Sequence, residues 1–347
     1  MIAPPLHGFG AAVLVLSAKD YARSRALWLK ARRSGLGASD TAAILGLNSR
    51  ATALDVWISK TATGEPEDVQ TDAMTAGHML EDTVARWTVA KYPWLGKLVP
   101  TPGLLAHPDH PWMLATLDRG LANRGSRDNP VRGILEVKTT SVANYKANWL
   151  EGVPPPAIQV QCQQQMAVTG MDECWVTVGV GGLDGPLSIP EPFRVGRSDR
   201  VIEQVVTYAG KWWEDHVLAN VRPEPTYGDA DKMASLYPAD ESLDAVPLTA
   251  DLEAHLATYL DAKRRADEAK DEASRAVFAL RLAMKSRTAI ADIDGRVVAT
   301  NKNQTKRTLD KKALVKDHPE VLDLLNEYTR PGKPFPVFRA KDEAESA

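Results

Sequence analysis

The chain has 347 residues, of which 44% are hydrophobic and 25% are charged, the composition of a globular protein large enough to bury a substantial core. Its formal net charge of −3 excludes a generally basic surface, so any contact with nucleic acid has to come from local positive patches. The two cysteines, Cys162 and Cys174, match no zinc or iron–sulfur spacing and exclude a disulfide framework, which is consistent with a reducing cytoplasm.

The N-terminal segment carries one short apolar run, Ala11 to Leu16, with no Lys or Arg before it. The run is too short to span a bilayer and lacks the charged start of a secretory signal. We therefore expect residues 1–17 to form a flexible leader, and we expect a cytoplasmic protein that binds no membrane.

Helical spacing of apolar residues recurs along much of the chain. Trp28, for example, lies on the apolar side of the first such segment. Gly and Pro residues, such as those at Gly64 to Pro66 and Pro154 to Pro156, separate the segments. The predicted helices cover residues 18–30, 53–61, 74–90, 141–150, 157–169 and 199–220.

A basic, glycine-bearing turn from Arg32 to Asp40 leads into a short apolar segment, Thr41 to Leu47. Ser39 or Asp40 is expected to cap the helix that begins there. A helix start that carries small residues, a hydroxyl group and Arg33 is also a natural seat for a phosphate. The two interpretations are compatible.

Strands and turns follow between Leu98 and Thr116, where several prolines interrupt the chain. A strand over Leu114–Leu117 ends at Asp118, and after a polar loop the next strand covers Ile134–Lys138. Asp118 and Glu136 can therefore meet across a hairpin. Further strands are predicted over residues 175–180 and 193–196.

Glu136 and Lys138 alternate with apolar residues, so their side chains share one face of the strand. One interpretation is an ion pair on a half-exposed strand, which is common and contributes little stability. In the other, Glu136 and Asp118 hold a divalent cation while Lys138 orients or activates a water, as in a metal-dependent phosphodiesterase. The fragment alone favours the ion pair, because short Glu-x-Lys matches are frequent by chance.

Two helices carry further polar residues of interest. Glu81 falls near the apolar side of its helix, where an acid is usually a partly buried, paired residue unless other carboxylates converge on it. Gln159 and Gln163 lie one turn apart in the glutamine-rich helix. For the other glutamines there we expect solvent-facing positions, and these are Gln161, Gln164 and Gln165.

Residues 221–248, rich in Pro, Asp and Ala, are predicted to be a linker to a second unit over residues 249–347. That unit begins with a helical arm whose positions alternate by four and three residues, like a coiled-coil seam. Lysines and alanines weaken the middle of the seam, so we expect packing against another part of the protein, or a partner, over a robust free-standing dimer. The seam positions are Leu252, Leu256, Tyr259, Lys263, Ala266, Lys270, Ala273, Val277, Leu280 and Met284.

A hairpin around Asp294-Gly295 is predicted over residues 290–300. The basic residues after it are the best auxiliary candidates for contact with backbone phosphates, although such a run is usually a solvated face. They are Lys302, Lys306, Arg307, Lys311, Lys312 and Lys316. The acidic end, residues 342–347, is expected to fray.

Five short motifs in chain order resemble the motif set of the YqaJ-type viral recombinases, which are similar to lambda exonuclease within the PD-(D/E)xK nuclease superfamily. The motifs are Arg33 with Gly37-Ala38-Ser39-Asp40, Gly77-His78-Met79-Leu80-Glu81, Ala115-Thr116-Leu117-Asp118, Leu135-Glu136-Val137-Lys138 and Ile158-Gln159-Val160-Gln161. The resemblance implies an α/β fold over residues 18–220, a mixed central sheet flanked by helices with the active site at one sheet edge. The arm and hairpin also resemble the C-terminal extension of many YqaJ-type proteins.

The resemblance further implies an activity, the Mg²⁺-dependent degradation of linear duplex DNA from a 5′ end to leave 3′ single strands. Mn²⁺ is expected to substitute for Mg²⁺. The expected partners are ends of double-stranded DNA and a single-strand annealing protein, in phage or prophage recombination within the bacterial host cytoplasm. The ring of subunits known in the lambda exonuclease family leaves a homo-oligomer open.

Carried over by residue, the resemblance makes Asp118, Glu136 and the backbone carbonyl of Val137 the metal ligands. Glu81 matches the helix acid that helps to bind the metal, directly or through water. Such a set suits the chemistry, because Mg²⁺ prefers a few oxygen ligands and keeps several waters. Metal-held charge also stabilises the anionic transition state of phosphodiester hydrolysis.

The same resemblance gives Lys138 the role of positioning and polarising the attacking water. Gln159, the first glutamine of its motif, matches a polar group that supports the site. Arg33 and Ser39 match the pair that binds phosphate.

The chain departs from the family pattern on both sides of Asp118. Leu117 replaces the usual proline and Arg119 replaces the common glycine, which changes the turn and leaves the carboxylate in place. Two alternatives stay open. One is an endonuclease of the restriction or junction-resolving kind with the same metal site, and the other is a non-catalytic DNA-binding or scaffold protein that uses the arm and the basic residues.

Overall fold

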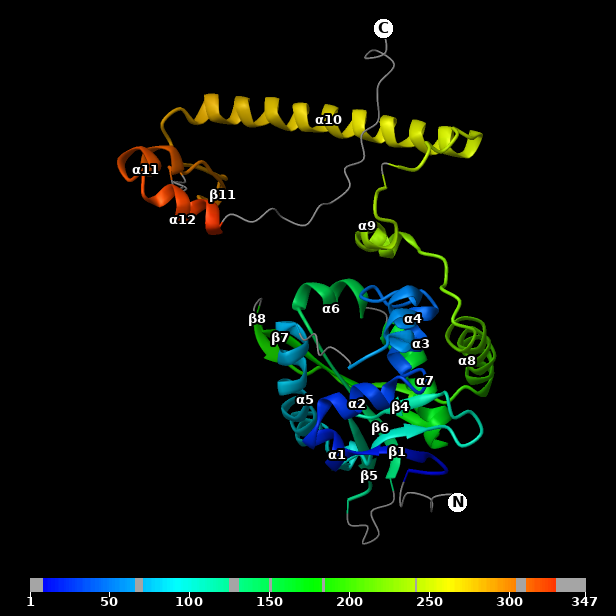
Figure 1. Cartoon of the computed structure of the whole chain (residues 1–347). Coiled ribbons are helices and arrows are strands. Elements are labelled where there is room, and N and C mark those ends of the chain that lie inside the picture. The colour runs from blue at the N-terminus through cyan, green and yellow to red at the C-terminus, as the bar shows by residue number, and fades with distance from the viewer. Residues whose placement is uncertain are drawn as a thin grey trace. The chain divides into compact units, whose positions relative to one another are not determined.

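The computed structural model describes residues 9–65, 71–124, 131–149, 152–182, 185–240, 242–303 and 310–328. The chain divides into two compact units, Met1–Asp231 and Lys232–Ala347 (Figure 1). The first unit contains the mixed sheet and the candidate site.

The centre of the first unit is a mixed sheet in the order β2-β5-β6-β7-β8, with β9 also paired to β7. The long strands β6 and β7 run parallel, and the other pairs are antiparallel. The bounds are β2 (Lys97–Val99), β5 (Arg119–Ala122), β6 (Val131–Thr140), β7 (Glu173–Gly182), β8 (Gly185–Ser188) and β9 (Phe193–Gly196). The mixed sheet flanked by helices that the sequence predicts is confirmed.

Alternation along β6 sends its side chains to two different cores. Leu135 and Val137 pack with Val84 of α5 (Asp72–Lys91) on one face. Ile134 packs on the other face, in the core that includes residues of α7 (Pro156–Thr169) and α8 (Asp199–Trp212). Glu136 and Lys138 have the parity of Ile134, so they share its face.

A second, three-stranded sheet has the order β1-β3-β4, formed by β1 (Val13–Ser17), β3 (Gly103–Ala106) and β4 (Leu114–Thr116). The flexible leader expected over residues 1–17 is therefore wrong for the part that the structure describes. Phe9 and Ala12 are buried in the main core, and β1 pairs with β3 along its length. The length of a short apolar run does not show whether it forms an edge strand. The evidence for the strand is its pairing with β3, which lies far away in the sequence.

The remaining helices of the first unit follow the predicted segments closely. The first segment is broken at Ser24, whose backbone closes one helix and whose side chain caps the next. The α8 segment continues as a π-helix, and η1 is a short 3₁₀ turn. The bounds are α1 (Ala18–Arg23), α2 (Arg25–Arg32), α3 (Ala38–Ile44), α4 (Ala53–Thr61), α6 (Val142–Asn148), η1 (Pro93–Leu95) and η2 (Trp213–Leu218).

The linker predicted over residues 221–248 contains two short helical segments, η3 (Tyr227–Lys232) and α9 (Met233–Leu236). Asp229 is fully buried, and it accepts hydrogen bonds from the Thr52 hydroxyl at 2.5 Å and from the Thr226 N–H at 2.9 Å. A buried carboxylate with such partners fixes this part of the chain against α4, which composition alone does not reveal.

The second unit contains the long helix α10 (Ala250–Met284), the hairpin β10 (Ala289–Ala291) and β11 (Val297–Thr300), and the short helices α11 (Lys311–Asp317) and α12 (Val321–Tyr328). The predicted hairpin is confirmed, with Gly295 at φ +79° in its turn. Of the basic residues after it, Lys306 and Arg307 lie outside the described residues, as does the acidic end of the chain. Within the described ranges, no helix combines the length and apolar character needed to cross a bilayer.

A buried charge cluster ties α2, α3 and α4 together. Lys60 of α4 is 3% exposed, and its Nζ lies 2.7 Å from Asp40 Oδ2 and donates to the Arg32 carbonyl at 2.8 Å. Arg32 Nη2 lies 2.8 Å from the other Asp40 oxygen. The N-cap of α3 is Gly37, two residues before the predicted Ser39, and its N–H donates to Asp40. Asp40 thereby fixes the end of α2 beside the start of α3.

Replacing Asp40 by Asn should lower the free energy of unfolding by about 3–5 kcal/mol, because Lys60 would remain buried without a carboxylate. Urea denaturation measures the loss. Asp215→Asn is the matched control, since its ion pair with Lys211 lies on the surface of the protein and should contribute less than about 1 kcal/mol. Equal, small losses in both variants would contradict the role given to the cluster.

The same variant has an expected pH dependence. Burial raises the pKa of Asp40, but the charges of Arg32 and Lys60 outweigh burial and hold it well below the usual range. A depressed folded-state pKa gives stability that is present above the unfolded pKa of about 3.9 and is lost as the pH falls below it. The stability difference between the wild-type protein and Asp40→Asn should therefore shrink below that pH.

Candidate metal and phosphate site

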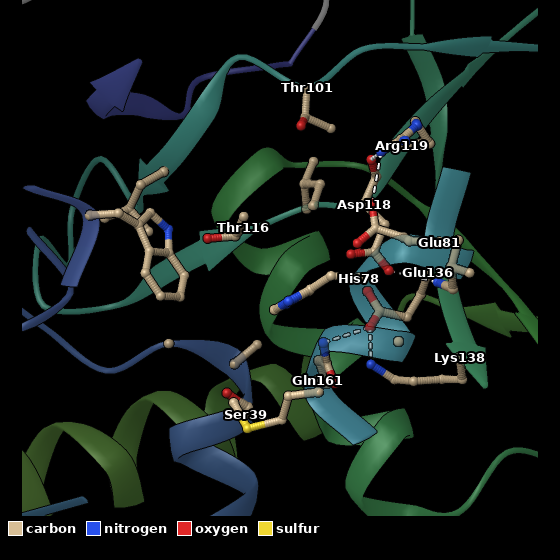
Figure 2. Close-up of a pocket in the computed structure, with 18 of the residues that line it drawn as sticks. Ser39, His78, Glu81, Thr101, Thr116, Asp118, Arg119, Glu136, Lys138 and Gln161 are labelled. Carbon is tan, nitrogen blue, oxygen red and sulfur yellow. Dashed lines mark hydrogen bonds and ion pairs between the residues drawn. The ribbon is translucent and has the colours of Figure 1, made fainter. Parts of the chain in front are cut away.

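The first unit contains a cleft of about 570 Å³. It lies where β5 begins, because β6 extends past the first residue of β5 and is not paired with β5 from Glu136 onward. Arg119 of β5 pairs with Leu135, so Glu136 and the residues after it are bonded only to β7. The site thus lies in a notch beside a central strand, not along the outermost strand of the sheet as "one sheet edge" would suggest. Figure 2 shows the side chains of Asp118, Glu136 and Lys138 converging there.

Asp118 meets Glu136 across the hairpin, as predicted. Its Oδ2 accepts the backbone N–H of Val137 at 2.7 Å. In a strand the N–H and the carbonyl of one residue point to the same side, so the Val137 carbonyl also faces the notch. Burial, and then the negative charge of Glu136, raise the pKa of Asp118 well above the usual range. The charge of Lys138 offsets only part of this effect on Asp118.

Glu136 is 1% exposed and is held by donors on α7 and β6. Its Oε1 accepts Gln161 Nε2 at 2.7 Å, and its Oε2 accepts Gln165 Nε2 at 2.7 Å. Gln159, the predicted supporting residue, donates instead to the Pro154 carbonyl at 2.8 Å. Spacing could not choose the right glutamine, because Gln161 and Gln165 are one turn apart in the same way as Gln159 and Gln163.

The solvent-facing positions expected for Gln161, Gln164 and Gln165 are wrong. Gln164 and Gln165 are fully buried, and Gln161 lines the cleft. Gln164 donates to the carbonyls of Leu36 and Leu114 at 2.8 and 2.9 Å, which joins the segment before α3 to β4. Buried amides on one helix can each satisfy a different backbone segment, and hydrophobic periodicity carries no signal for this.

Lys138 forms an ion pair with Glu136, so the structure contains the contact that the isolated Glu-x-Lys fragment suggests. This ion pair does not lie on a half-exposed strand, as that interpretation assumed. Glu136 is buried, and Lys138 is 30% exposed and lines the cleft. Burial alone would lower the pKa of Lys138, but the charges of Glu136 and Asp118 outweigh burial and raise it above its usual value. Lys138 is therefore a fixed cation whose ammonium lies beside both carboxylates. Its assignment to water, and of Glu136 to metal, stays a prediction.

Glu81 of α5 lines the same cleft but is paired with Arg119, whose Nη1 lies 2.9 Å from its Oε1. Arg119 Nη2 also lies 3.0 Å from Asp82, and Arg119 donates to the Asp118 carbonyl. Arg119, which replaces the glycine of the motif, is thus the ion-pair partner of Glu81, the acid on α5. Leu117, which replaces the usual proline, is buried in the main core.

The structure brings Arg32 to Ser39, and not the predicted Arg33. Arg32 Nη2 donates to Ser39 Oγ at 3.4 Å, and both residues line the cleft with Asp118. Arg33 donates to the Gly64 carbonyl at 2.6 Å and lines a separate cavity beside α4. The sequence spacing did offer a signal for Arg32, because it lies one helical turn after Trp28. In the structure the Arg32 guanidinium carbon lies 5.0 Å from the centre of the Trp28 ring.

His78 is a further cleft residue that sequence analysis passed over. It precedes Glu81 by three residues on α5, so the two side chains share one side of that helix (Figure 2). The motif Gly77-His78-Met79-Leu80-Glu81 contains it, but spacing alone gave it no role.

The donor set fits Mg²⁺ better than a transition metal. Among the described residues, no group of three or more His, Cys, Asp and Glu side chains is arranged to hold a metal ion. Mg²⁺ is usually bound through one or two carboxylates and keeps several waters, whereas zinc takes three or four nitrogen or sulfur ligands. Asp118 and Glu136 supply two carboxylates, and Lys138 balances only one of their charges.

Solved structures with a similar arrangement are distant. The alkaline exonuclease LHK-Exo of Laribacter hongkongensis is 20% identical, with a TM-score of 0.44 over 60% of this chain and 98% of that chain. The complex of LHK-Exo with dAMP gives 19% identity and a TM-score of 0.45 over 61% and 99%. A phage related exonuclease from Haemophilus somnus 129PT gives 12% and 0.36 over 54% and 96%. TM-scores this low carry no argument about function.

Comparison of sequences is more specific. The chain is 28% identical over 317 residues to the uncharacterized protein YqaJ of Bacillus subtilis (strain 168), a match that covers 90% of this chain and 94% of that protein. Residues 27–172 match the family described as YqaJ-like viral recombinase domain, and this range contains the whole constellation from Arg32 to Gln165. The match to the YqaJ-like viral recombinase domain thus lies wholly within the first unit of the chain.

Proposed function

We propose that this protein is a Mg²⁺-dependent exonuclease that degrades linear duplex DNA in the 5′ to 3′ direction and leaves 3′ single strands. The observation that carries the proposal is the buried pair Asp118 and Glu136, with Lys138 as a fixed cation beside it, at the wall of an open cleft. The match of residues 27–172 to the YqaJ-like viral recombinase domain agrees with it. The biological setting is phage or prophage recombination in a bacterial cytoplasm.

In this mechanism Asp118, Glu136 and the Val137 carbonyl would hold the metal, and Glu81 would contribute through water once released by Arg119. When bound, Mg²⁺ supplies positive charge to the phosphorus oxygens and lowers the pKa of a bound water. Gln161 and Gln165 fix the carboxylate of Glu136, since each oxygen accepts one amide. Lys138 holds the attacking water by donating to it from the cleft side.

Arg32 and Ser39 are the proposed seat for a terminal 5′ phosphate, with Asp40 paired to the Arg32 guanidinium and Lys60 donating to the Arg32 backbone carbonyl. An arginine suits this role because its planar group can donate two parallel hydrogen bonds to a phosphate. Arg33 faces the other cavity, so it is left out of the seat. The expected partners are DNA ends and a single-strand annealing protein that covers the released strand.

An endonuclease with the same metal site is the second candidate, since the carboxylates and Lys138 would serve either reaction. The open cleft does not distinguish an end from a continuous duplex. A covalently closed circular duplex does, because an enzyme that needs an end leaves it intact.

With Mg²⁺, the purified protein should digest linear duplex DNA and spare the closed circle. Lys138→Ala and Glu136→Ala should lower the rate by at least about 10²–10³-fold, because the first removes the cation that holds the attacking water and the second removes a proposed metal ligand. Lys146→Ala, an exposed lysine on α6, is the matched control and should retain the wild-type rate. Circular dichroism checks that all variants are folded. Undiminished cleavage by folded Lys138→Ala would overturn the site assignment.

A duplex labelled at one 5′ end tests the phosphate seat. The wild-type protein should prefer a 5′ phosphate over a 5′ hydroxyl, and Arg32→Gln should reduce that preference by about 10–100-fold, the value of a charge-assisted hydrogen bond. Arg33→Gln should keep the preference. Loss of the preference in Arg33→Gln, with Arg32→Gln unaffected, would restore the sequence-based assignment and contradict the structural one.

A further inference from the structure

The helix α10 exposes an apolar seam to solvent. Leu252, Val277 and Leu280 keep 42%, 45% and 48% of their surface exposed. Charged residues on other sides of the helix pair within it, as Arg264 does with Asp261 and Glu268 at 2.7 Å. A helix in water gains most of its stability from packing of its apolar face, so this seam calls for a partner.

The lysines within the seam decide the orientation of a second copy. In a parallel, in-register pair, Lys263 would face Lys263 and Lys270 would face Lys270, which stacks like charges in the middle of the interface. In an antiparallel pair centred on residue 268, Lys263 faces Ala273 and Lys270 faces Ala266. A lysine opposite an alanine has room to lay its stem along the interface and keep its ammonium in water.

The same antiparallel register matches the apolar layers. Leu256 faces Leu280, and Tyr259 faces Val277, so each large apolar residue of the seam between residues 256 and 280 meets another apolar residue. Met284 is already buried in its own copy, and the outermost layer with Leu252 is therefore left out. Each matched layer occurs twice, because the pair is symmetric.

The residues that flank the seam complement each other in charge and size. On one side Glu253 faces Arg281 of the second copy, again twice, and both residues are exposed in the single chain. At the centre Asp267 meets its own copy, with Lys270 of the second copy beside it to offset the repulsion. The other side carries alanine at every seventh position, which lets two helices approach closely, and these residues are Ala262, Ala269, Ala276 and Ala283.

From these layers we infer that α10 forms the interface of an antiparallel homodimer with a second copy of this chain. The lysines and alanines in the middle of the seam make it less apolar than a typical coiled coil. The same residues favour the antiparallel orientation of the two helices over the parallel one. The inference concerns assembly alone and does not rest on the proposed nuclease function. It replaces the expectation that the arm packs against another part of the protein, or a partner, over a robust free-standing dimer.

Disulfide trapping in the full chain tests the orientation. Leu256→Cys mixed with Leu280→Cys should give a covalent heterodimer on mild oxidation, because these positions face each other across the pair. Leu256→Cys alone should give none, since its two copies would lie about 36 Å apart at 1.5 Å of helix rise per residue. The native cysteines Cys162 and Cys174 are buried, so the unsubstituted chain supplies the background. Self-linkage of Leu256→Cys without the heterodimer would establish a parallel pair and overturn the inference.

Sedimentation equilibrium with a charge swap tests the interface itself. Glu253→Arg and Arg281→Glu should each weaken dimerisation about tenfold, because each places like charges opposite one another twice. The double variant restores opposite charges and should recover the wild-type dissociation constant. A monomer at all concentrations, or a trimer, or a dimer that ignores all three variants, would contradict the assignment. Circular dichroism confirms that each variant keeps its helix content.

Discussion

The first unit depends on a buried carboxylate that cannot be left without partners. Glu136 is 1% exposed, and an ionised group so far from water is stable only if its lone pairs are satisfied. Gln161, Gln165 and Lys138 supply the donors from α7 and β6. Asp118 then places a second negative charge beside it without a second fixed cation. Two carboxylates that share Lys138 as a neighbouring cation fit the proposed metal site.

The helix α7 connects that site to the rest of the unit. Its glutamines reach β4, β6, the segment before α3 and the start of α8, so one helix sets the positions of several otherwise separate pieces of backbone. The cluster of Asp40 and Lys60 does the same for Arg32 at the other wall of the cleft. The groups proposed for catalysis and binding are thus held by buried polar contacts, whose loss would cost stability as well as geometry.

Periodicity predicted most helices and the meeting of Asp118 with Glu136, because these features follow from local spacing and one short hairpin, whereas the mixed sheet was implied by the motif resemblance. It missed β1 and the anchoring of Asp229, since both depend on partners far away in the sequence. The motif resemblance assigned roles to Gln159 and Arg33, where the structure places Gln161 beside Glu136 and Arg32 beside Ser39. Neighbouring residues of one type on a helix differ only in the direction they face, and that direction is set by tertiary packing. The pairing of Glu81 with Arg119 had no local signal at all.

The central claim is that Asp118 and Glu136 form a site for Mg²⁺. Calorimetric titration of Mg²⁺ into the DNA-free protein tests it most directly, with Asp118→Asn as the test variant and Asp215→Asn as the surface control. The account predicts one binding event that Asp118→Asn abolishes and Asp215→Asn retains. Unchanged Mg²⁺ binding by folded Asp118→Asn would contradict it.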